Sequence, residues 1–528
     1  MKRKSMPREP AQKENMSITM KRNISKRMSQ RIELKLPEFE IPTKFFLFFI
    51  STGIALRILS FWFIPASTDA FVYAAMGEAF LKQGEFILPL GNSFFIPGNP
   101  EFSHHFPPLY PIYLSLFFLF FGVSVEVLQI ASIISGLLLI PTTYFCTSDI
   151  WGKRCGLAAA SIMAVEPASI YIGGLGFAEN LLCALFILTM WAILKGIKDE
   201  RYIVLAGLFA GLSYLTKSSM GWFFIIAGIC GLTWRFYYIR WKVFRSKYYM
   251  LGIGVFLALW GIWAVRNLIH FWDGNLLTLF TAWETSEYIA YVQYNVFSYP
   301  WEFLYVFVLR IPLFFLFFLM LAWPWLLEFW KMKKLEETNS ALLLSIGLVY
   351  LIGMFFASAF WVFEHHPIFW FLIIRYVMPA NISIIWLVVN YYAKDWNEKE
   401  KRCAFNRGWL TSFLTVFIVA LLVTTPLIGV PRERGEIKAL VWLRENGHDG
   451  MSIALQGIHQ YEVYIYLHSF KPEIVCINTT PTADYILSLD LNANYSQQGY
   501  HIVGTFYSSG GFSESINTNA DAVVWKKM

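Results

Sequence analysis

Charged and polar residues gather at one edge of the apolar segments that dominate this sequence. Asp69 directly follows the first long apolar segment, in "STDAFVYAAMGEAF", and Tyr73 lies four residues later on the same face of a predicted helix. A charged side chain in or beside a membrane segment is costly and by default marks a functional position. The other residues of this kind are Arg57, His104, His105, Glu179, Lys217, Arg266, His270 and Arg375.

This set is mainly cationic and contains few carboxylates, which suits the binding of a lipid-borne phosphate. Several of these residues are equally compatible with a structural role. Arg57 and Arg375 can snorkel to an interface or close internal ion pairs, and Lys217 lies near an interface, where a lysine costs little. Asp69 can also cap the helix that follows it, a task that Thr68 can share.

A divalent cation is a second candidate occupant. Asp69, Glu179 and His270 offer oxygen and nitrogen ligands of the kind that zinc or manganese accepts. Their spacing matches no metal-binding motif, and the sequence has no D-x-D pair for a metal-dependent nucleotide-sugar site. The sequence therefore predicts no certain cofactor, and Glu179 and His270 remain the candidate metal ligands.

The composition indicates which elements must position these residues. The chain has 528 residues, of which 56% are hydrophobic and 15% charged. A soluble domain is about a quarter charged, so a water-soluble enzyme is excluded. The 21 Trp, 27 Tyr and 49 Phe residues suit aromatic belts at both surfaces of a bilayer. The sequence thus predicts a multi-pass membrane protein.

The N-terminal tail, residues 1–43, is basic and contains no apolar stretch, so it is not a cleavable signal peptide. Basic residues before a first crossing place the N-terminus in the cytoplasm, near anionic lipid. A nucleic-acid partner is disfavoured because the basic residues lack interleaved aromatic side chains.

Apolar runs of about 20 residues predict the membrane crossings. Basic loops at 235–247, 331–337 and 394–402 mark the cytoplasmic side, so the first external loop, 65–105, and the C-terminal region face outward. The apolar run 107–122 breaks this alternation, and it is either a non-crossing element or an additional crossing. The predicted crossings are 44–64, 126–147, 157–173, 178–194, 202–216, 219–234, 249–266, 303–328, 341–360, 366–390 and 408–430.

From residue 431 the composition changes to that of a small α/β domain. Strands are predicted in "MSIALQG", "PEIVCIN", "DYILSL", "YHIVGTFYS" and "DAVVWKKM", with a helix in "QYEVYIYLH". We therefore predict a polytopic α-helical membrane protein with about 11–13 transmembrane segments in residues 44–430 and an extracytoplasmic α/β domain in residues 431–528.

The order of the motifs resembles that of the GT-C glycosyltransferases of the protein mannosyltransferase and aminoarabinose transferase type. The shared features are the Asp after the first crossing, a Pro-Pro motif in "HHFPP", "GLSYLTK", "RN" after a Trp-rich helix, and "RYVMP". The resemblance covers residues 44–430. It implies transfer of a sugar from a polyprenyl phosphate, dolichyl or undecaprenyl, to an acceptor on the extracytoplasmic face, with inversion of the anomeric centre.

By this resemblance Asp69 is the general base that deprotonates the acceptor hydroxyl. The family commonly has a second acid after this position, whereas this chain has Ala70. The resemblance further assigns Lys217 and Arg375 to the leaving phosphate. The family's Lys-Pro-Pro is "HHFPP" here, so His104 or His105 takes the role of the lysine.

Glu179 matches an acidic position of the family, and His270 matches a histidine that is a metal ligand in some members. The acceptor is a protein, a lipid or a glycan, and the implied location is the plasma membrane, in cell-envelope or protein glycosylation.

Two other functions fit parts of the sequence. A transporter or flippase of lipid-linked sugars would use the same basic residues but would not need Asp69. An oligosaccharyltransferase has the same architecture, but its soluble domain carries a Trp-Trp-Asp motif that this sequence lacks.

Overall fold

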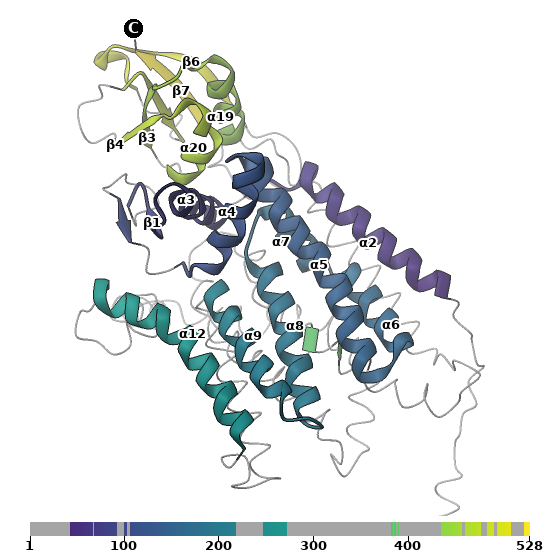
Figure 1. The fold of residues 1–528 in the computed structure, drawn as a ribbon. Coiled ribbons are helices and arrows are strands. Elements are labelled where there is room, and N and C mark those ends of the chain that lie inside the picture. The colour runs from purple at the N-terminus through teal and green to yellow at the C-terminus, as the bar shows by residue number, and fades with distance from the viewer. Residues whose placement is uncertain are drawn as a thin grey trace, which may run out of the picture.

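A bundle of apolar helices carries a small α/β domain at one end in the computed structural model (Figure 1). The structure describes residues 43–66, 68–91, 100–102, 106–217, 246–271, 378, 382, 383, 385, 386, 389, 435–456, 460–476, 483–489, 494–507 and 522–527. The predicted fold class, a helical membrane protein with a C-terminal α/β domain, is confirmed.

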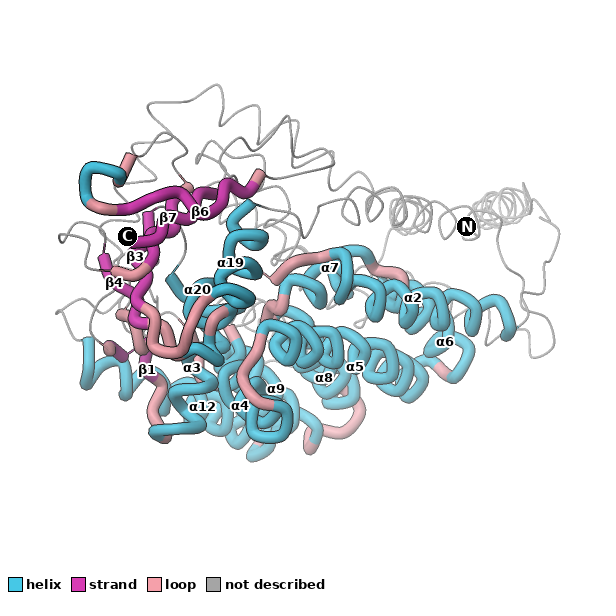
Figure 2. Tube along the Cα trace, turned by 90° about the horizontal axis from the view of Figure 1, so that it is seen from above, coloured by secondary structure: helices cyan, strands magenta, loops and turns pink. Residues whose placement is uncertain are grey.

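Among the described residues, four helices are long and apolar enough to cross a bilayer: α2 (Thr43–Phe63), α5 (Val125–Trp151), α8 (Glu179–Gly196) and α12 (Lys247–Phe271). Each is at least 18 residues long and has a mean hydropathy of 1.4 or more, as a spanning helix needs. They coincide with the predicted crossings 44–64, 126–147, 178–194 and 249–266. In the view from above, α5, α8 and α9 lie side by side (Figure 2).

The predicted crossing 157–173 is a broken helix. It consists of α6 (Lys153–Ala164) and α7 (Pro167–Leu175), which meet at an angle of 53°. Pro167 has no backbone N–H with which to continue α6, but it suits the first position of a new helix. The Glu166 carboxylate caps α7 by accepting a hydrogen bond of 2.6 Å from the Ser169 N–H. The break is therefore encoded locally.

Two apolar helices are shorter: α4 (Leu109–Phe121) and α9 (Tyr202–Thr216). The 13 residues of α4 rise about 20 Å, less than the ~30 Å hydrocarbon core of a bilayer. α4 packs against α3, α5 and α9. These dimensions favour the interpretation of run 107–122 as a non-crossing element.

The predicted crossing 202–216 is the helix α9, whereas the other remaining predicted crossings contribute little to the described structure. Runs 219–234, 303–328, 341–360 and 408–430 lie outside the described residues, so the total of 11–13 segments stays a prediction. Within 366–390 the described residues are helical, and Trp386 packs edge-on against Trp151 of α5 with ring centroids 5.5 Å apart.

The first external loop folds on the end of the bundle. It begins with α3 (Thr68–Gln83), whose chain turns at Gly84 with φ of 74°. A short antiparallel hairpin follows, made of β1 (Ile87–Leu88) and β2 (Glu101–Phe102). α3 packs against α4 on one side and against the C-terminal domain on another.

The C-terminal domain contains every predicted strand. Its sheet has the order β4-β3-β5-β7-β6, in which β3, β4 and β5 are parallel and β7 is antiparallel to β5 and β6. The elements are α19 (Gly435–Asn446), β3 (Ser452–Gln456), α20 (Gln460–Tyr466), η2 (His468–Phe470), β4 (Glu473–Cys476), β5 (Tyr485–Ser488), η3 (Ser496–Gln498), β6 (Tyr500–Phe506) and β7 (Ala522–Lys527).

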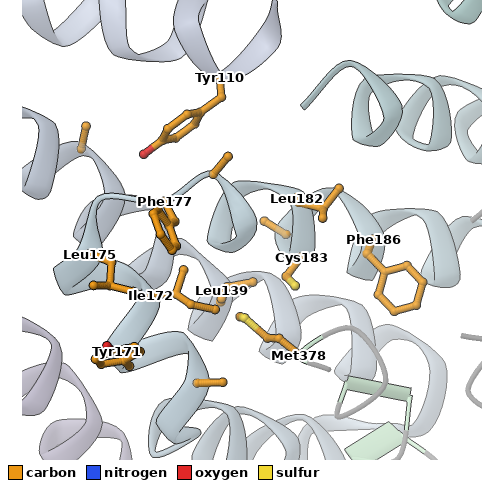
Figure 3. Close-up of a cluster of buried hydrophobic side chains, with 14 of the residues drawn as sticks. Tyr110, Leu139, Tyr171, Ile172, Leu175, Phe177, Leu182, Cys183, Phe186 and Met378 are labelled. Carbon is orange, nitrogen blue, oxygen red and sulfur yellow. The ribbon is translucent and has the colours of Figure 1, made fainter. Parts of the chain in front are cut away.

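The main hydrophobic core joins the first external loop to the bundle. Figure 3 shows Tyr110 pointing from α4 toward Phe177, above Leu182 and Phe186 of α8. Small residues in α3 and α6, many of them alanine, allow the helices to approach closely. This packing fixes the helix ends from which the site side chains project.

Candidate active site

Three charged side chains from distant parts of the sequence meet at the end of the bundle that carries the C-terminal domain. The Lys217 ammonium Nζ lies 2.6 Å from Oε1 of Glu179 and 3.9 Å from Oδ2 of Asp69. The shorter contact is a hydrogen-bonded ion pair, whereas the longer one is an electrostatic contact without a direct hydrogen bond. Two carboxylates therefore share one ammonium.

Each charge sits at a helix end that suits its sign. Asp69 is in the first turn of α3, Glu179 is the first residue of α8, and Lys217 is the C-cap of α9. The partial positive charge of a helix N-terminus favours a carboxylate, and the C-terminus favours a cation. The ends of three helices thus assemble the cluster and stabilise its charges.

The three side chains differ in their access to solvent. The side chain of Glu179 is 1% exposed, that of Lys217 is 9% exposed, and that of Asp69 is 24% exposed. Burial strengthens the Lys217–Glu179 attraction but makes each partner costly without the other. Asp69 is the accessible member, so it is the group that can meet a substrate.

Ala70, where the resemblance implies a second acid, faces the bundle rather than the cluster. It is fully buried, and its Cβ lies against Gly176 of the α7–α8 connection. Gly176 has φ of 83°, and its carbonyl accepts a hydrogen bond of 2.7 Å from the Tyr110 hydroxyl. The Cβ of Ala70 therefore packs against Gly176, and Asp69 is the accessible acid at the start of α3.

Arg57 is completely buried in α2, and both of its Nη groups donate hydrogen bonds to protein acceptors. Nη2 donates to the carbonyl of Met163 and to the Ser169 hydroxyl, both at 2.9 Å, and Nη1 donates to the carbonyl of Ala164. These carbonyls belong to the last turn of α6, which has no helical donors left to satisfy them. Arg57 therefore stabilises the break between α6 and α7.

Hydrogen bonds also connect Arg57, through Ser169, to a neighbour of the cluster. The Ser169 carbonyl accepts a hydrogen bond of 3.1 Å from the side-chain amide of Asn180, the neighbour of Glu179. The chain Arg57–Ser169–Asn180 connects α2, α7 and the start of α8. Arg57 thus supports the position of Glu179 indirectly.

Arg266 and His270 lie on one side of α12 and enclose the ring of Phe102 from the hairpin. The Arg266 guanidinium lies 5.3 Å from the Phe102 ring centroid and 4.4 Å from that of Trp263, and the His270 ring centroid is 4.1 Å from that of Phe102. Arg266 also donates a hydrogen bond of 3.2 Å to the Phe86 carbonyl. These contacts attach the first external loop to α12.

Tyr73 is fully buried, although it follows Asp69 by one helical turn. Its ring packs edge-on against Phe106 and Tyr110, with centroids 4.9 and 5.1 Å away. It therefore contributes to the packing of α3 on α4. His104, His105 and Arg375, the other predicted phosphate-binding residues, lie outside the described residues.

A metal site does not emerge from the part of the chain that the structure describes. Among those residues no three His, Cys, Asp or Glu side chains are grouped so that they could hold a metal ion. Glu179 instead pairs with Lys217, and the His270 ring packs at a tilt against that of Phe102. Glu179 and His270 are therefore not arranged as ligands of a divalent cation.

Several residues that hold α3, the helix of Asp69, in place are not marked by any motif in the sequence. Glu78 of α3 bonds to His468 of the C-terminal domain, and Tyr461 of α20 bonds to the loop after β1. The signal that could have pointed to this contact is a carboxylate, Glu78, inside the otherwise apolar run of α3.

Comparisons with known proteins agree with this architecture. The sequence model of the family described as dolichyl-phosphate-mannose-protein mannosyltransferase matches residues 105–263, less than a third of the chain. No curated protein sequence matches the chain.

Solved structures match over most of the chain's length. ArnT of Cupriavidus metallidurans in the apo state has a TM-score of 0.58 at 12% identity, with 92% of this chain and 98% of ArnT covered. The same protein bound to undecaprenyl phosphate gives 0.55 at 11% identity, with the same coverage. The oligosaccharyltransferase of Archaeoglobus fulgidus, in complex with zinc and sulfate, gives 0.54 at 16% identity, with 90% of this chain and 74% of that chain covered.

The described residues therefore have the fold of a multi-pass membrane protein similar to ArnT and to the archaeal oligosaccharyltransferase. The resemblance to GT-C glycosyltransferases of the protein mannosyltransferase and aminoarabinose transferase type, which the order of the sequence motifs predicted, is confirmed at the level of the fold.

Proposed function

We propose that the protein is a glycosyltransferase that moves a sugar from a polyprenyl phosphate to a hydroxyl-bearing acceptor. The observation that carries this proposal is the accessible carboxylate of Asp69, which lies 3.9 Å from the ammonium of Lys217. That ammonium forms an ion pair with the buried carboxylate of Glu179. A base beside a fixed cation is what transfer from a phosphate requires. The structure of ArnT with undecaprenyl phosphate supports a lipid-phosphate donor on this fold.

In the proposed reaction, Asp69 accepts the proton of the acceptor hydroxyl. The acceptor oxygen forms a bond to the anomeric carbon of the donor, and the bond between that carbon and the phosphate oxygen breaks. The electron pair leaves with the polyprenyl phosphate, so a single displacement inverts the anomeric centre. Positive charge must balance the negative charge that develops on the leaving phosphate.

Lys217 is our candidate for that charge, with Arg375 and His104 or His105 as further candidates from the sequence. Glu179 holds the Lys217 ammonium in place. Arg57 is assigned a different role, because its hydrogen bonds go to the end of α6 and to Ser169. We also propose that the protein lies in the plasma membrane. This site and the C-terminal domain face outward, and the N-terminus lies in the cytoplasm.

The test uses purified protein in nanodiscs with polyprenyl-phosphate sugars, and it follows release of the free polyprenyl phosphate. Asp69→Asn removes the base but keeps the size of the side chain, and we expect turnover to fall about 10²- to 10⁴-fold. Asp199→Asn is the matched control, since Asp199 forms an exposed ion pair with Arg201 in the α8–α9 turn, where pairs contribute little.

Equal turnover of Asp69→Asn and the wild type would contradict the assignment of the base. Movement of lipid-linked sugar across the bilayer of a liposome, without release of polyprenyl phosphate, would instead support a flippase.

A further inference from the structure

The C-terminal domain makes specific contacts with α3, the helix that carries Asp69. α20 packs against α3 (Figure 1). The rings of Tyr466 and Phe71 meet with centroids 5.7 Å apart. Phe71 is fully buried and lies two residues after Asp69. The domain therefore touches α3 within one helical turn of the proposed base.

The strongest of these contacts reaches a buried charge. The side chain of Glu78 is 2% exposed, and its Oε1 lies 2.6 Å from Nε2 of His468 in η2. Lys82, one turn further along α3, pairs with the same oxygen. A buried carboxylate without partners is costly, so His468 stabilises the face of α3 that the domain covers.

A second contact attaches the segment directly after β1. The Tyr461 hydroxyl donates a hydrogen bond of 2.6 Å to the Gly91 carbonyl and accepts one of 3.3 Å from the Leu90 N–H. Gln460 adds a hydrogen bond of 3.1 Å from its side-chain amide to the Leu90 carbonyl. α3 and the loop after β1 are thus bound to the same short helix.

A third contact lies on a crossing helix. Arg444 of α19 pairs with Glu126 in the first turn of α5 at 3.4 Å. Both side chains are about half exposed, so this pair contributes little energy. It shows, however, that the domain rests on a membrane-crossing helix while it binds α3.

These contacts can determine the position of Asp69. Nine residues separate Asp69 from Glu78, so a rise of about 13.5 Å along one continuous helix connects them. A helix transmits a rotation or shift along its length, and a misplacement of about 1 Å can reduce a rate about 100-fold.

We infer that the C-terminal domain holds α3 in its catalytic position and that Tyr461 and His468 are positioning residues for the base. This inference rests on the proposed glycosyl transfer. The α20–η2 segment of the domain keeps Asp69 beside Lys217.

The experiment compares His468→Ala, His468→Gln and Tyr461→Phe in the full-length protein in nanodiscs. Hydrogen–deuterium exchange reports protection of the α3 amides, and release of polyprenyl phosphate gives kcat and the donor KM. We expect faster exchange in α3 and a kcat about 10- to 100-fold lower in His468→Ala, with the donor KM within about twofold of wild type. His468→Gln keeps a hydrogen-bond donor for Glu78 and should recover most of the loss.

The controls are His501→Ala and Tyr507→Phe, whose side chains are exposed on and after β6. Both should leave α3 exchange and turnover at wild-type values. Unchanged α3 exchange in His468→Ala and Tyr461→Phe would overturn the inference, as would faster exchange with unchanged kcat. A wild-type protein that releases no polyprenyl phosphate from any donor would instead overturn the proposed function, which the positioning role requires.

Discussion

Lys217 lies 2.6 Å from Glu179, closer than it lies to the accessible Asp69, although 38 residues separate the two partners in the sequence. The buried pair fixes the ammonium, and the third charge is left on the open side of the cluster. An ammonium held in this way needs little reorganisation when a negative charge develops beside it.

This geometry predicts strong coupling between Lys217 and Glu179. Lys217→Met leaves the Glu179 carboxylate buried without its cation and should destabilise the protein by about 3–5 kcal/mol. Glu179→Gln should cost less, because the Asp69 carboxylate still balances the ammonium. The double variant should be more stable than the sum of the single effects predicts, as measured by thermal unfolding in micelles. Additivity within about 0.5 kcal/mol would show that the two side chains do not interact.

The sequence alone does not show which of these charged side chains pair with one another. Asp69, Glu179 and Lys217 were each recognised as charges beside apolar segments, and the motif order supplied their candidate roles. Their pairing depends on how the ends of α3, α8 and α9 meet, which is a property of tertiary packing. The same limit applies to His468, which lies in a domain whose sequence contains no catalytic motif.

Local patterns, by contrast, predicted the elements well. The β-branched runs of the C-terminal domain form the strands that alternating and buried apolar patterns indicate. The long apolar runs within the described residues form helices. The sequence missed the bend between α6 and α7, because both halves are apolar and only Pro167, with the capping acid Glu166 before it, marks the break.

Substitution of Arg57 distinguishes a structural role of this side chain from a role in phosphate binding. Arg57→Met leaves the carbonyls of Met163 and Ala164 without their donors, and each unsatisfied buried group costs about 1–3 kcal/mol. We therefore expect a large loss of thermal stability, while the folded fraction keeps its donor KM. A donor KM raised more than about tenfold, with an unchanged melting temperature, would assign Arg57 to the phosphate instead.

Docking of the C-terminal domain should weaken at acid pH. Burial by itself would raise the pKa of Glu78, but hydrogen bonds from His468 and Lys82 outweigh this effect and hold the pKa below its ordinary value of 4.5. Lys82 on α3, Tyr464 on α20 and His468 on η2 are the titratable groups around it. The ionised carboxylate therefore stabilises the docked state above pH 4.5, and this contribution is lost as the pH falls through the lowered pKa.

The measurement for this prediction is proteolytic release of the C-terminal domain between pH 6 and pH 3. Wild-type protein should release the domain faster as the pH falls below 4.5. Glu78→Gln should release it faster already at pH 6 and should lose this part of the pH dependence. A wild-type profile that matches that of Glu78→Gln would exclude Glu78 as the titrating group.

Substitution of Gly176 tests whether close packing determines the position of α3. Its φ of 83° disfavours any side chain, at a cost of about 1–2 kcal/mol. A Cβ there would also lie 3.1 Å from the Cβ of Ala70 and 3.2 Å from Cγ of Leu128, so the segment beside Asp69 would have to shift. Gly176→Ala should therefore lower both the melting temperature and the turnover.

Gly254→Ala in α12 is the matched control, because a Cβ there meets nothing within 4 Å and alanine favours a helix by about 0.5–1 kcal/mol. If both glycine variants kept wild-type stability and turnover, close packing of α3 against the α7–α8 connection would not position Asp69.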